Sequence, residues 1–343
     1  MTAHSSPRVL CFGEALVDRL GPPGGDPGQE GAGDDRLGGA PANVACGLGR
    51  LGTATAFLGR VGEDCIGAAF AALFADRGVD SRCLQWDLER PSRIVLVRRD
   101  PTGDRSFGGF SGDRGLGFAD QAIDGSGLRQ AVLPLLGGAA WLLCGTLPLA
   151  SPGSAEALEG LLPLLRQHGV ALAVDVNWRP TFWGLAADQG PPAPVLARMQ
   201  PLLQQADLIK CTREEALWLF SSTDAVGLQR SLPRQPAVLI TDGPQPVAWA
   251  IGGACGRLPA MAVQAVDTTG AGDAFTAGLL HQLERQPDLL GGGADPDRRQ
   301  AALRFAAACG ALVCRGVGAI DPQPAEAQVE EFLRQAPPVE VGP

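Results

Sequence analysis

The stretch Asp267-Thr268-Thr269-Gly270-Ala271-Gly272-Asp273 places a turn of small residues directly before a helical pattern over residues 272–283. An apolar run over residues 262–266 precedes it, and we expect that run to be a strand. A glycine-rich turn between a strand and a helix lets a ligand approach the main chain closely. The stretch therefore predicts an anion-binding helix N-terminus in an α/β protein.

The residues of this turn suggest two chemical roles. The backbone N–H groups of Gly270, Ala271 and Gly272 are the expected anion ligands, and the helix dipole adds partial positive charge there. Asp273 falls in the first helical turn, where a carboxylate can accept the proton of an attacking hydroxyl. The alternative is a structural turn in which Asp273 only stabilises the helix. No Walker A loop is present, because the single lysine, Lys210, follows an isoleucine.

Composition limits the kinds of partner. The chain has 343 residues, 45% of them hydrophobic, which is enough for a large core and excludes disorder. A net charge of -9 without a basic tract argues against nucleic acid or an anionic membrane as a partner, and favours small molecules. Nine single cysteines without a C-x-x-C pair predict reduced thiols in the cytoplasm. The apolar runs are too short for a signal peptide or a membrane span.

Apolar runs and helical patterns alternate along most of the chain. Because the expected strands are apolar throughout, this predicts a parallel sheet covered by helices on both faces, in one domain over residues 1–343. The expected strands are 8–12, 55–58, 140–144, 170–176, 208–210 and 237–241. The expected helices are 41–51, 64–76 with Asp64 as N-cap, 155–167, 194–205, 214–220 and 300–314.

Two segments interrupt this alternation. Residues 93–99 and 104–110 alternate around a Pro-Thr-Gly turn and predict a hairpin, while residues 18–39 predict a loop or an exposed hairpin. We expect them to form a small β lid from segments of about 14–38 and 91–112, with 326–343 as a C-terminal tail. The string Gly47-Leu-Gly-Arg-Leu-Gly52 matches the dinucleotide fingerprint. It ends a helical pattern instead of following a strand, so we interpret it as a helix C-terminus and turn.

Residues 267–278 resemble the signature of the ribokinase-like (PfkB) carbohydrate kinase family. Two further strings agree. Gly38-Gly-Ala-Pro-Ala-Asn43-Val-Ala is similar to the family's sugar-binding signature, and Gly13-Glu-Ala-Leu-Val-Asp18 resembles the N-terminus of the fructokinase branch. The resemblance covers about residues 8–325. It implies a three-layer α/β/α, doubly wound fold with a small β lid, and transfer of the γ-phosphoryl of Mg-ATP to a sugar hydroxyl, with fructose as the expected sugar.

The resemblance also implies roles for individual residues. Arg179 lies in a D-x-N-x-R-x-x-x-W string over residues 175–183, and Thr212 to Glu215 match an N-x-x-E segment with threonine in place of asparagine. The implied sugar-binding residues are Asp18, Gly38, Gly39, Asn43, Arg93, Phe107 and Arg179. The implied nucleotide-binding residues are Lys210, Thr212, Glu215, Thr241, Gly243, Gly272, Ala307 and Gly310. Glu215 would organise the water shell of Mg²⁺, and Asp267, Thr269 and Gly318 would bind K⁺.

Three departures from the family pattern affect the nucleotide and cation sites. Gln245-Pro246 stands where a second glycine is expected, Ala307 replaces an asparagine, and Pro322 replaces a serine.

Several alternatives stay open at this stage. Within the enzyme class they are ribokinase, nucleoside kinase and 2-keto-3-deoxygluconate kinase, the last of which needs a cation such as Arg93 or Arg105 for its substrate carboxylate. The others are a catalytically silent fructokinase-like binding protein and a dinucleotide oxidoreductase. A homodimer through the lid is a further expectation.

Overall fold

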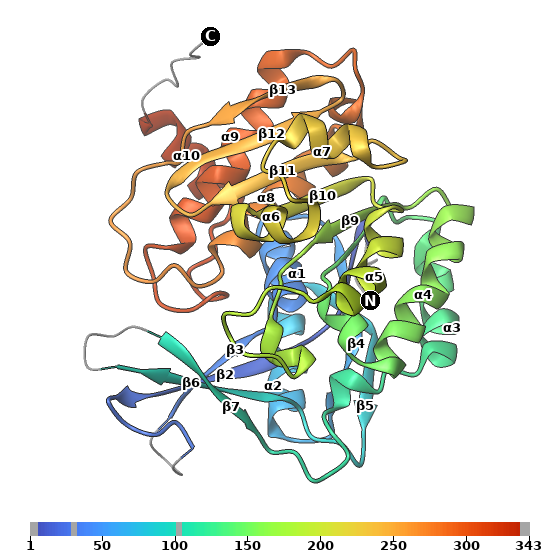
Figure 1. Ribbon diagram of the computed structural model, residues 1–343, viewed down its shortest axis with the longest axis vertical. Helices are drawn as coiled ribbons and strands as arrows, with labels where there is room; N and C mark the ends of the chain where they lie inside the picture. The colour runs from blue at the N-terminus through green and yellow to red at the C-terminus, as the bar shows by residue number, and fades with distance from the viewer. Residues whose placement is uncertain (1–5, 29–32, 101–104, 337–343) are drawn as a thin grey trace.

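The computed structural model describes residues 6–28, 33–100 and 105–336, and its main body is a nine-stranded sheet between two layers of helices (Figure 1). Strands β11, β10, β9, β8, β1, β4 and β5 lie side by side in this order and run parallel. The antiparallel strands β12 and β13 extend the β11 edge. The bounds are β1 Val9–Phe12, β4 Thr55–Gly62, β5 Val79–Asp87, β8 Trp141–Cys144, β9 Ala171–Asp175, β10 Leu208–Thr212, β11 Ala237–Asp242, β12 Gln245–Ile251 and β13 Ala254–Leu258.

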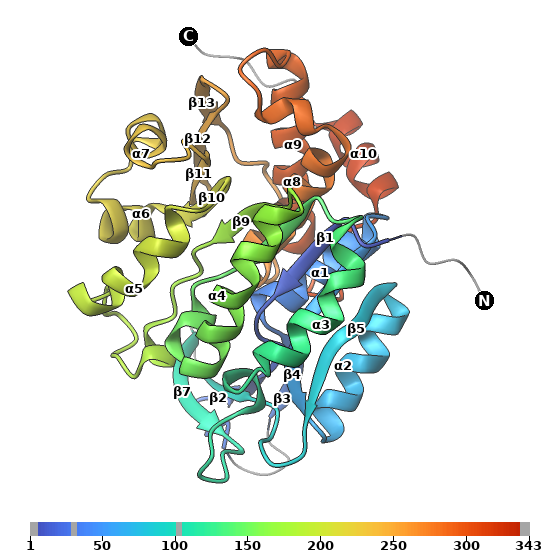
Figure 2. The same ribbon diagram turned by 90° about the vertical axis from the view of Figure 1, so that its right-hand side faces the viewer.

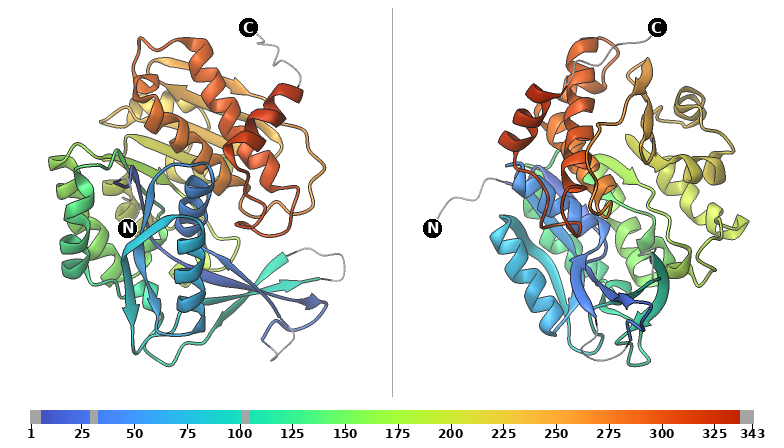
Figure 3. Two further views of the ribbon diagram at one scale, coloured as in Figure 1. Left: turned by 180° about the vertical axis from the view of Figure 1, so that it is seen from behind. Right: turned by 90° about the vertical axis from the view of Figure 1, so that its left-hand side faces the viewer.

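Alternate residues of the central strands feed two separate cores. In β1, Val9 and Cys11 join one core, and Leu10 and Phe12 join the other, as expected for a strand whose side chains alternate between faces. One face is covered by α1 (Ala40–Arg50), α2 (Cys65–Asp76), α8 (Ala271–Arg285), α9 (Pro296–Val313) and α10 (Glu326–Gln335). The other is covered by α3 (Gly125–Leu136), α4 (Pro152–Gln167), α5 (Ala193–Leu203), α6 (Arg213–Phe220) and α7 (Ala225–Ser231). The predicted three-layer α/β/α architecture is confirmed (Figures 2 and 3).

A second sheet of four strands lies at one end of the molecule (Figure 1). Its order is β3-β2-β6-β7, with β2 (Leu16–Pro23) and β6 (Ile94–Arg99) parallel in the middle. Strands β3 (Asp34–Gly38) and β7 (Arg105–Ser111) pair antiparallel on the outside. The predicted hairpin of residues 93–110 is present as β6 and β7, and the segment expected as a loop or an exposed hairpin forms the hairpin of β2 and β3. The tips at 29–32 and 101–104 lie outside the described residues.

The expected strand over residues 262–266 is wrong. Residues 259–266 have no regular secondary structure, and Val266 is 63% exposed. The chain leaves the sheet at Leu258, the last residue of β13, and Pro259 follows without an N–H to continue the ladder. The glycine turn is therefore entered from an exposed connection, although α8 begins as expected.

The string Gly47 to Gly52 is structural, as interpreted. It forms the last turn of α1 and the turn after it, where Gly52 has a φ of +87°. A Cβ added to Gly47 would lie 2.9 Å from the Cβ of Ala277, so this glycine lets α1 pack closely against α8.

Two further observations concern the rest of the chain. All nine cysteines are free thiols, and α10 occupies residues of the expected C-terminal tail. Within the described ranges, no helix has the length and apolarity that crossing a bilayer requires.

Candidate active site

The N-terminus of α8 forms the first part of the candidate site. Gly270 precedes the helix with a φ of +78°, and a Cβ added there would lie 2.6 Å from the Cα of Ala319. Glycine alone tolerates both this left-handed backbone and so close an approach. Ala271 donates its backbone N–H to the Thr268 carbonyl at 3.2 Å. The amides of Gly270 and Gly272 are therefore the stronger candidates for holding an anion.

Asp273, in the first turn of α8, contacts a residue from a distant part of the sequence. Nδ2 of Asn43, in α1, donates a hydrogen bond of 2.7 Å to Oδ2 of Asp273. Asn43 is buried, and its Oδ1 has no hydrogen-bond partner in the described part of the chain. Burial raises the pKa of Asp273, and the nearby charge of Asp175 adds to the effect. The two predicted residues thus lie together, with hydrogen-bonding capacity left for a ligand.

Lys210 reaches the same helix end from the sheet. It pairs in register with Asp175 on the neighbouring parallel strand, and its Nζ donates to Oδ2 of Asp175 at 2.8 Å. The hydroxyl of Thr276, one turn into α8, donates to the same oxygen at 2.9 Å. A Cβ added to Gly272 would lie 2.8 Å from Nζ, so the ammonium group lies directly against the start of α8.

The charge state of Lys210 follows from this environment. Burial acts to lower its pKa, but the charge of Asp175 and the hydrogen bond to it outweigh burial, and the net pKa is raised. Lys210 is therefore a fixed cation with 6% of its surface exposed. The sequence suggested a main-chain cradle that works without a lysine loop. Lys210, which the family resemblance assigns to the nucleotide side, lies on β10 directly beside that cradle.

Thr212 and Glu215 begin α6 as a capping box. The Glu215 amide donates to Oγ1 of Thr212 at 3.1 Å, and the Thr212 amide donates to Oε2 of Glu215 at 2.7 Å. Oε1 accepts a further bond of 2.6 Å from the amide of Trp178. Burial raises the pKa of the Glu215 carboxyl. This side chain therefore fixes the loop after β9 against the start of α6.

The carboxylates near this point suit only an indirect role toward a metal ion. The described residues contain no group of three or more His, Cys, Asp or Glu side chains that could hold a metal. Each oxygen of Glu215 accepts one backbone N–H, so each retains capacity to accept from a water molecule. Mg²⁺ typically keeps several waters and binds phosphate oxygens with few protein ligands. The residues present fit that mode.

Arg179 lies in the loop after β9 with an exposed side chain. Its Nη1 donates to the carbonyl of Trp178 at 3.1 Å, and its charge acts to lower the pKa of Asp273. Arg179 is thus a cation near Asp273, and its exposed guanidinium can still contact a ligand.

The predicted residues of the glycine turn before α1 lie beside Asp18. A Cβ added to Gly38 would lie 3.1 Å from Oδ2 of Asp18, and one added to Gly39 would lie 2.5 Å from the carbonyl oxygen of Glu14. Gly39 has a φ of +100°. The turn is therefore packed against the segment between β1 and β2, at the junction of the two sheets.

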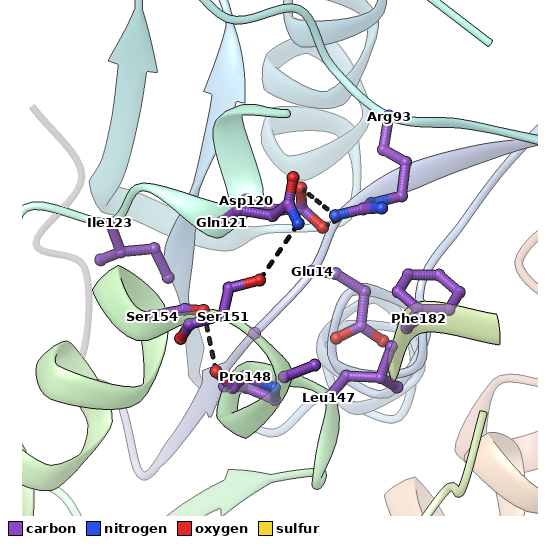
Figure 4. A pocket seen from close by; sticks show the side chains of 12 residues that line it. Glu14, Arg93, Asp120, Gln121, Ile123, Leu147, Pro148, Ser151, Ser154 and Phe182 are labelled. Atoms are coloured by element: carbon purple, nitrogen blue, oxygen red, sulfur yellow. Dashed lines mark hydrogen bonds and ion pairs between the residues drawn. The ribbon is translucent and has the colours of Figure 1, made fainter. Parts of the chain in front are cut away.

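Arg93 is placed differently from what its predicted role requires. Its guanidinium makes two hydrogen bonds to Asp120, of 2.9 and 3.0 Å (Figure 4). It also lies 4.9, 4.4 and 4.8 Å from the ring centres of three phenylalanines, Phe110, Phe118 and Phe182. With 4% of its surface exposed, this side chain fixes the four-stranded sheet to the main body. Phe107, on β7, is 37% exposed. The side chain of Arg105 lies outside the described residues.

The remaining predicted nucleotide residues lie at the end of β11, in the strand-to-strand turn after it and on α9. Oγ1 of Thr241 donates to the carbonyl of Cys211 at 3.4 Å, and Gly243 turns the chain into β12 with a φ of +53°. On α9, Ala307 is half-buried, and a Cβ added to Gly310 would lie 2.9 Å from the carbonyl oxygen of Ala271. Gly310 therefore allows α9 to contact the first residue of α8.

The three residues predicted to bind a monovalent cation also lie together. Oδ1 of Asp267 accepts the backbone N–H of Thr269 at 3.0 Å and its hydroxyl at 2.7 Å. Oδ2 of Asp267 accepts the amide of Gly318 at 3.0 Å. The carboxylate thus joins the loop before α8 to the loop after α9.

Two residues of this site, Asp175 and Thr276, receive no role from the sequence pattern. Asp175 is the first residue of the string over 175–183, and Thr276 lies within the helical pattern over 272–283. The signal for Asp175 was its position at the carboxyl end of an apolar strand, where ligands bind in open α/β sheets. Its partnership with Lys210 depends on the register of β9 against β10.

Comparison with known proteins agrees with this geometry. Residues 6–326 match the family described as pfkB family carbohydrate kinase. The chain is 33% identical over 340 residues to a probable chloroplastic fructokinase-6 of Arabidopsis thaliana, covering 98% of this chain and 84% of the relative. The structure of a Xylella fastidiosa fructokinase with bound ATP superposes with a TM-score of 0.83 at 29% identity, covering 96% and 99% of the two chains. A Vibrio cholerae fructokinase with fructose, ADP and a calcium ion gives 0.79 at 27% identity, with coverage of 96% and 99%. The chain belongs to the pfkB family of carbohydrate kinases.

Proposed function

We propose that this protein transfers the γ-phosphoryl group of ATP to the primary hydroxyl of fructose and releases fructose 6-phosphate and ADP. One observation carries the proposal: Asp273, Asn43 and Lys210 come from three distant segments and meet at the N-terminus of α8. The related structures with ATP, and with fructose and ADP, support the choice of substrates.

In the proposed reaction, Asp273 accepts the proton of the sugar hydroxyl. The hydroxyl oxygen forms a bond to the γ-phosphorus as the bond to the β–γ bridging oxygen breaks, and ADP leaves with that electron pair. The amides of Gly270 and Gly272, together with the ammonium of Lys210, stabilise the negative charge on the transferring group. Asn43, Asp18 and Gly39 hold the sugar hydroxyls in position. Burial and the charge of Asp175 raise the pKa of Asp273, which makes its carboxylate a stronger base toward the sugar hydroxyl.

The nucleotide and its ions would bind around the same helix end. Thr241, Gly243, Ala307 and Gly310 would line the nucleotide side, and Mg²⁺ would neutralise phosphate charge, with Glu215 accepting from its water shell. We place a monovalent cation at Asp267, Thr269 and Gly318.

The four-stranded sheet would close over the sugar and exclude water. We also propose that this sheet mediates a homodimer and that the protein works in the cytoplasm, where its nine free thiols stay reduced.

A substrate panel tests this function. Purified protein is mixed with Mg-ATP and fructose, ribose, 2-keto-3-deoxygluconate or a nucleoside, and ADP release is measured for each. We expect the highest kcat/KM with fructose, and D273N serves as the matched inactive control. The pairing of Arg93 with Asp120 disfavours that arginine as a carboxylate ligand for 2-keto-3-deoxygluconate. Faster turnover with another sugar would reassign the substrate, and no ADP release with any of them would refute a kinase.

A further inference from the structure

Glu14 is a buried carboxyl group to which the proposed mechanism gives no role. It follows β1 and precedes β2, the strand that carries Asp18. Its side chain is 5% exposed, and Oε1 accepts the backbone N–H of Ala40 at 3.1 Å. Ala40 is the first residue of α1 and follows the glycine turn Gly38-Gly39. One carboxyl group therefore connects the entrance of the four-stranded sheet to the start of the helix that carries Asn43.

The backbone of Glu14 makes the same connection. A Cβ added to Gly39 would lie 2.5 Å from the carbonyl oxygen of Glu14, and one added to Gly13 would lie 2.7 Å from Cγ of Pro41. The backbone of Glu14 thus lies against Gly39, and the backbone of Gly13 lies against the ring of Pro41. A small displacement of Glu14 would move Asp18 and Asn43 relative to each other, since it is joined to the segments that carry both.

The second oxygen of Glu14 has unused hydrogen-bonding capacity. Oε2 is buried and has no hydrogen-bond partner among the residues that the structure describes. The carboxyl group lines a small cavity of about 20 Å³ together with Arg93, Asp120, Ser151 and Phe182, which is room for about one water molecule. In Figure 4, no dashed line joins Glu14 to the other residues drawn.

Among the described residues, no unpaired cation lies beside Glu14 to compensate a negative charge there. Arg93 lines the cavity, but its Nε and Nη2 both donate to the carboxylate of Asp120. The other titratable groups that face Glu14 are Asp120 and Asp273, which are acidic, and the buried thiol of Cys144. Burial, with a smaller contribution from the charges of Asp120 and Asp273, raises the pKa of the Glu14 carboxyl to about 7.

We propose that Glu14 is a positioning residue for the sugar site, and that its ionised form holds the turn Gly38-Gly39-Ala40 more firmly than its protonated form. A carboxylate oxygen makes a stronger, charge-assisted bond to the Ala40 amide than a neutral carboxyl oxygen does. This inference rests on the proposed function, because Asp18 and Asn43 are assigned there to the sugar. The consequence is that the KM for fructose decreases as pH rises through neutrality, while the KM for ATP does not.

The first test does not require kinase activity. Protein labelled with ¹³C at the glutamate carboxyl carbons is titrated between pH 5 and 9, for wild type, E14Q and the exposed control E159Q. We expect one carboxyl resonance that titrates near neutral pH in wild type and E159Q and is missing in E14Q. If E14Q loses no such resonance, the proposal is wrong, whatever the protein phosphorylates.

The second test measures KM for each substrate against pH. Glutamine keeps an oxygen that can accept from Ala40 but does not titrate, so E14Q should show a KM for fructose that no longer changes around pH 7. E14A removes the acceptor and should raise the KM for fructose about five- to tenfold, the loss expected for one hydrogen bond, with a smaller change in kcat. Equal changes in the KM for ATP and for fructose would overturn a positioning role. If E14A does not fold, E14Q alone decides the question. Titration of Glu14 in a protein without kinase activity would refute only the proposed function.

Discussion

The two ends of helix α8 both carry buried polar side chains, but they use them differently. At the N-terminal end, Asp273, Asn43 and Lys210 surround an open helix terminus. At the C-terminal end, His281 is 2% exposed and lies among Thr53, Arg285 and Glu326. The same helix therefore offers an internal comparison between a candidate site and a structural network.

Unused hydrogen-bonding capacity distinguishes the N-terminal end. Oδ1 of Asn43 has no partner in the described part of the chain, and burial raises the pKa of Asp273. Such groups are costly in a folded protein unless a ligand completes them. Perturbed titratable groups of this kind are concentrated at functional sites.

Saturated hydrogen bonding distinguishes the C-terminal end. Nδ1 of His281 lies 2.7 Å from Oγ1 of Thr53, and Nε2 lies 3.3 Å from Oε1 of Glu326 and 3.2 Å from Nη1 of Arg285. The imidazole also stacks on the ring of Phe305. With both ring nitrogens occupied, this histidine connects α8 to α10 and to the turn after α1, and has nothing left to offer a ligand.

The largest expected effect comes from D273N. Without a general base, kcat should fall by about 10²–10⁴-fold, while ATP binding and the thermal midpoint change little. Steady-state kinetics, calorimetric titration with ATP and a thermal melt measure the three quantities. In wild type, activity should fall as pH drops through the raised pKa of Asp273, because the protonated carboxyl cannot accept a proton. Unchanged turnover in D273N would remove the distinction between the two ends.

The second prediction concerns stability at the N-terminal end. K210M leaves the Asp175 carboxylate buried beside Thr276 without its cation, and should lower the free energy of unfolding by about 3–5 kcal/mol. The double variant K210M/D175N removes the unpaired charge and should recover part of that loss. Urea denaturation measures both. A double variant no more stable than K210M would show that the ion pair is not what stabilises this strand end.

The third prediction concerns the C-terminal end. H281A should lower the free energy of unfolding by about 1–3 kcal/mol at neutral pH, because it leaves buried partners unpaired, with kcat unchanged. Burial lowers the pKa of His281 below its ordinary value of 6.5, so the unfolded chain binds the proton more readily. The stability that this histidine contributes is therefore lost as pH falls from about 6.5 through its lowered pKa in the folded state.

Denaturation of wild type, H281A and the exposed control H168A at several pH values tests this sign. The difference between wild type and H281A should shrink toward acid pH, while that between wild type and H168A stays small throughout. A difference that grows on acidification would contradict a buried neutral imidazole.

The smallest expected effect tests how far the candidate site extends onto α9. Fructokinases often carry asparagine at the position of Ala307, which is half-buried on the same helix as Gly310. A307N should lower the KM for ATP by about two- to fivefold, the effect of one added hydrogen bond. The exposed neighbour variant A301N is the control. An unchanged KM for ATP would show that residue 307 does not contact the nucleotide.

Local sequence patterns predicted much of the main sheet, because they are properties of short segments. The apolar run of β1 and the helix α2 are examples, and Asp64 caps that helix by accepting the amide of Gly67 at 2.9 Å. Strands β12 and β13 are not predicted from the sequence, because they form an edge hairpin whose residues are partly exposed and give no continuous apolar run. The strand expected over 262–266 is absent for a different reason: the composition of this run suits a strand, but the chain leaves the sheet at Leu258 and the run pairs with no described strand.

The candidate site was predictable where one segment carries the whole signal. Gly270 and Asp273 belong to one turn, and Asn43 to another. The pairing of Lys210 with Asp175 was not predictable in this way, since it arises from the register of two strands 35 residues apart. The true environment of Arg93 likewise depends on aromatic residues from three other segments.

The close contact between Gly47 and Ala277 controls the distance between Asn43 and Asp273. Because α1 and α8 meet where neither side chain is larger than a methyl group, the separation of the two helix axes is fixed at a position one turn from both Asn43 and Asp273. A bulkier residue at either position would push the two helices apart and lengthen the distance between the Asn43 amide and the Asp273 carboxylate without changing either side chain. The packing of two small residues therefore sets the spacing of the reactive groups.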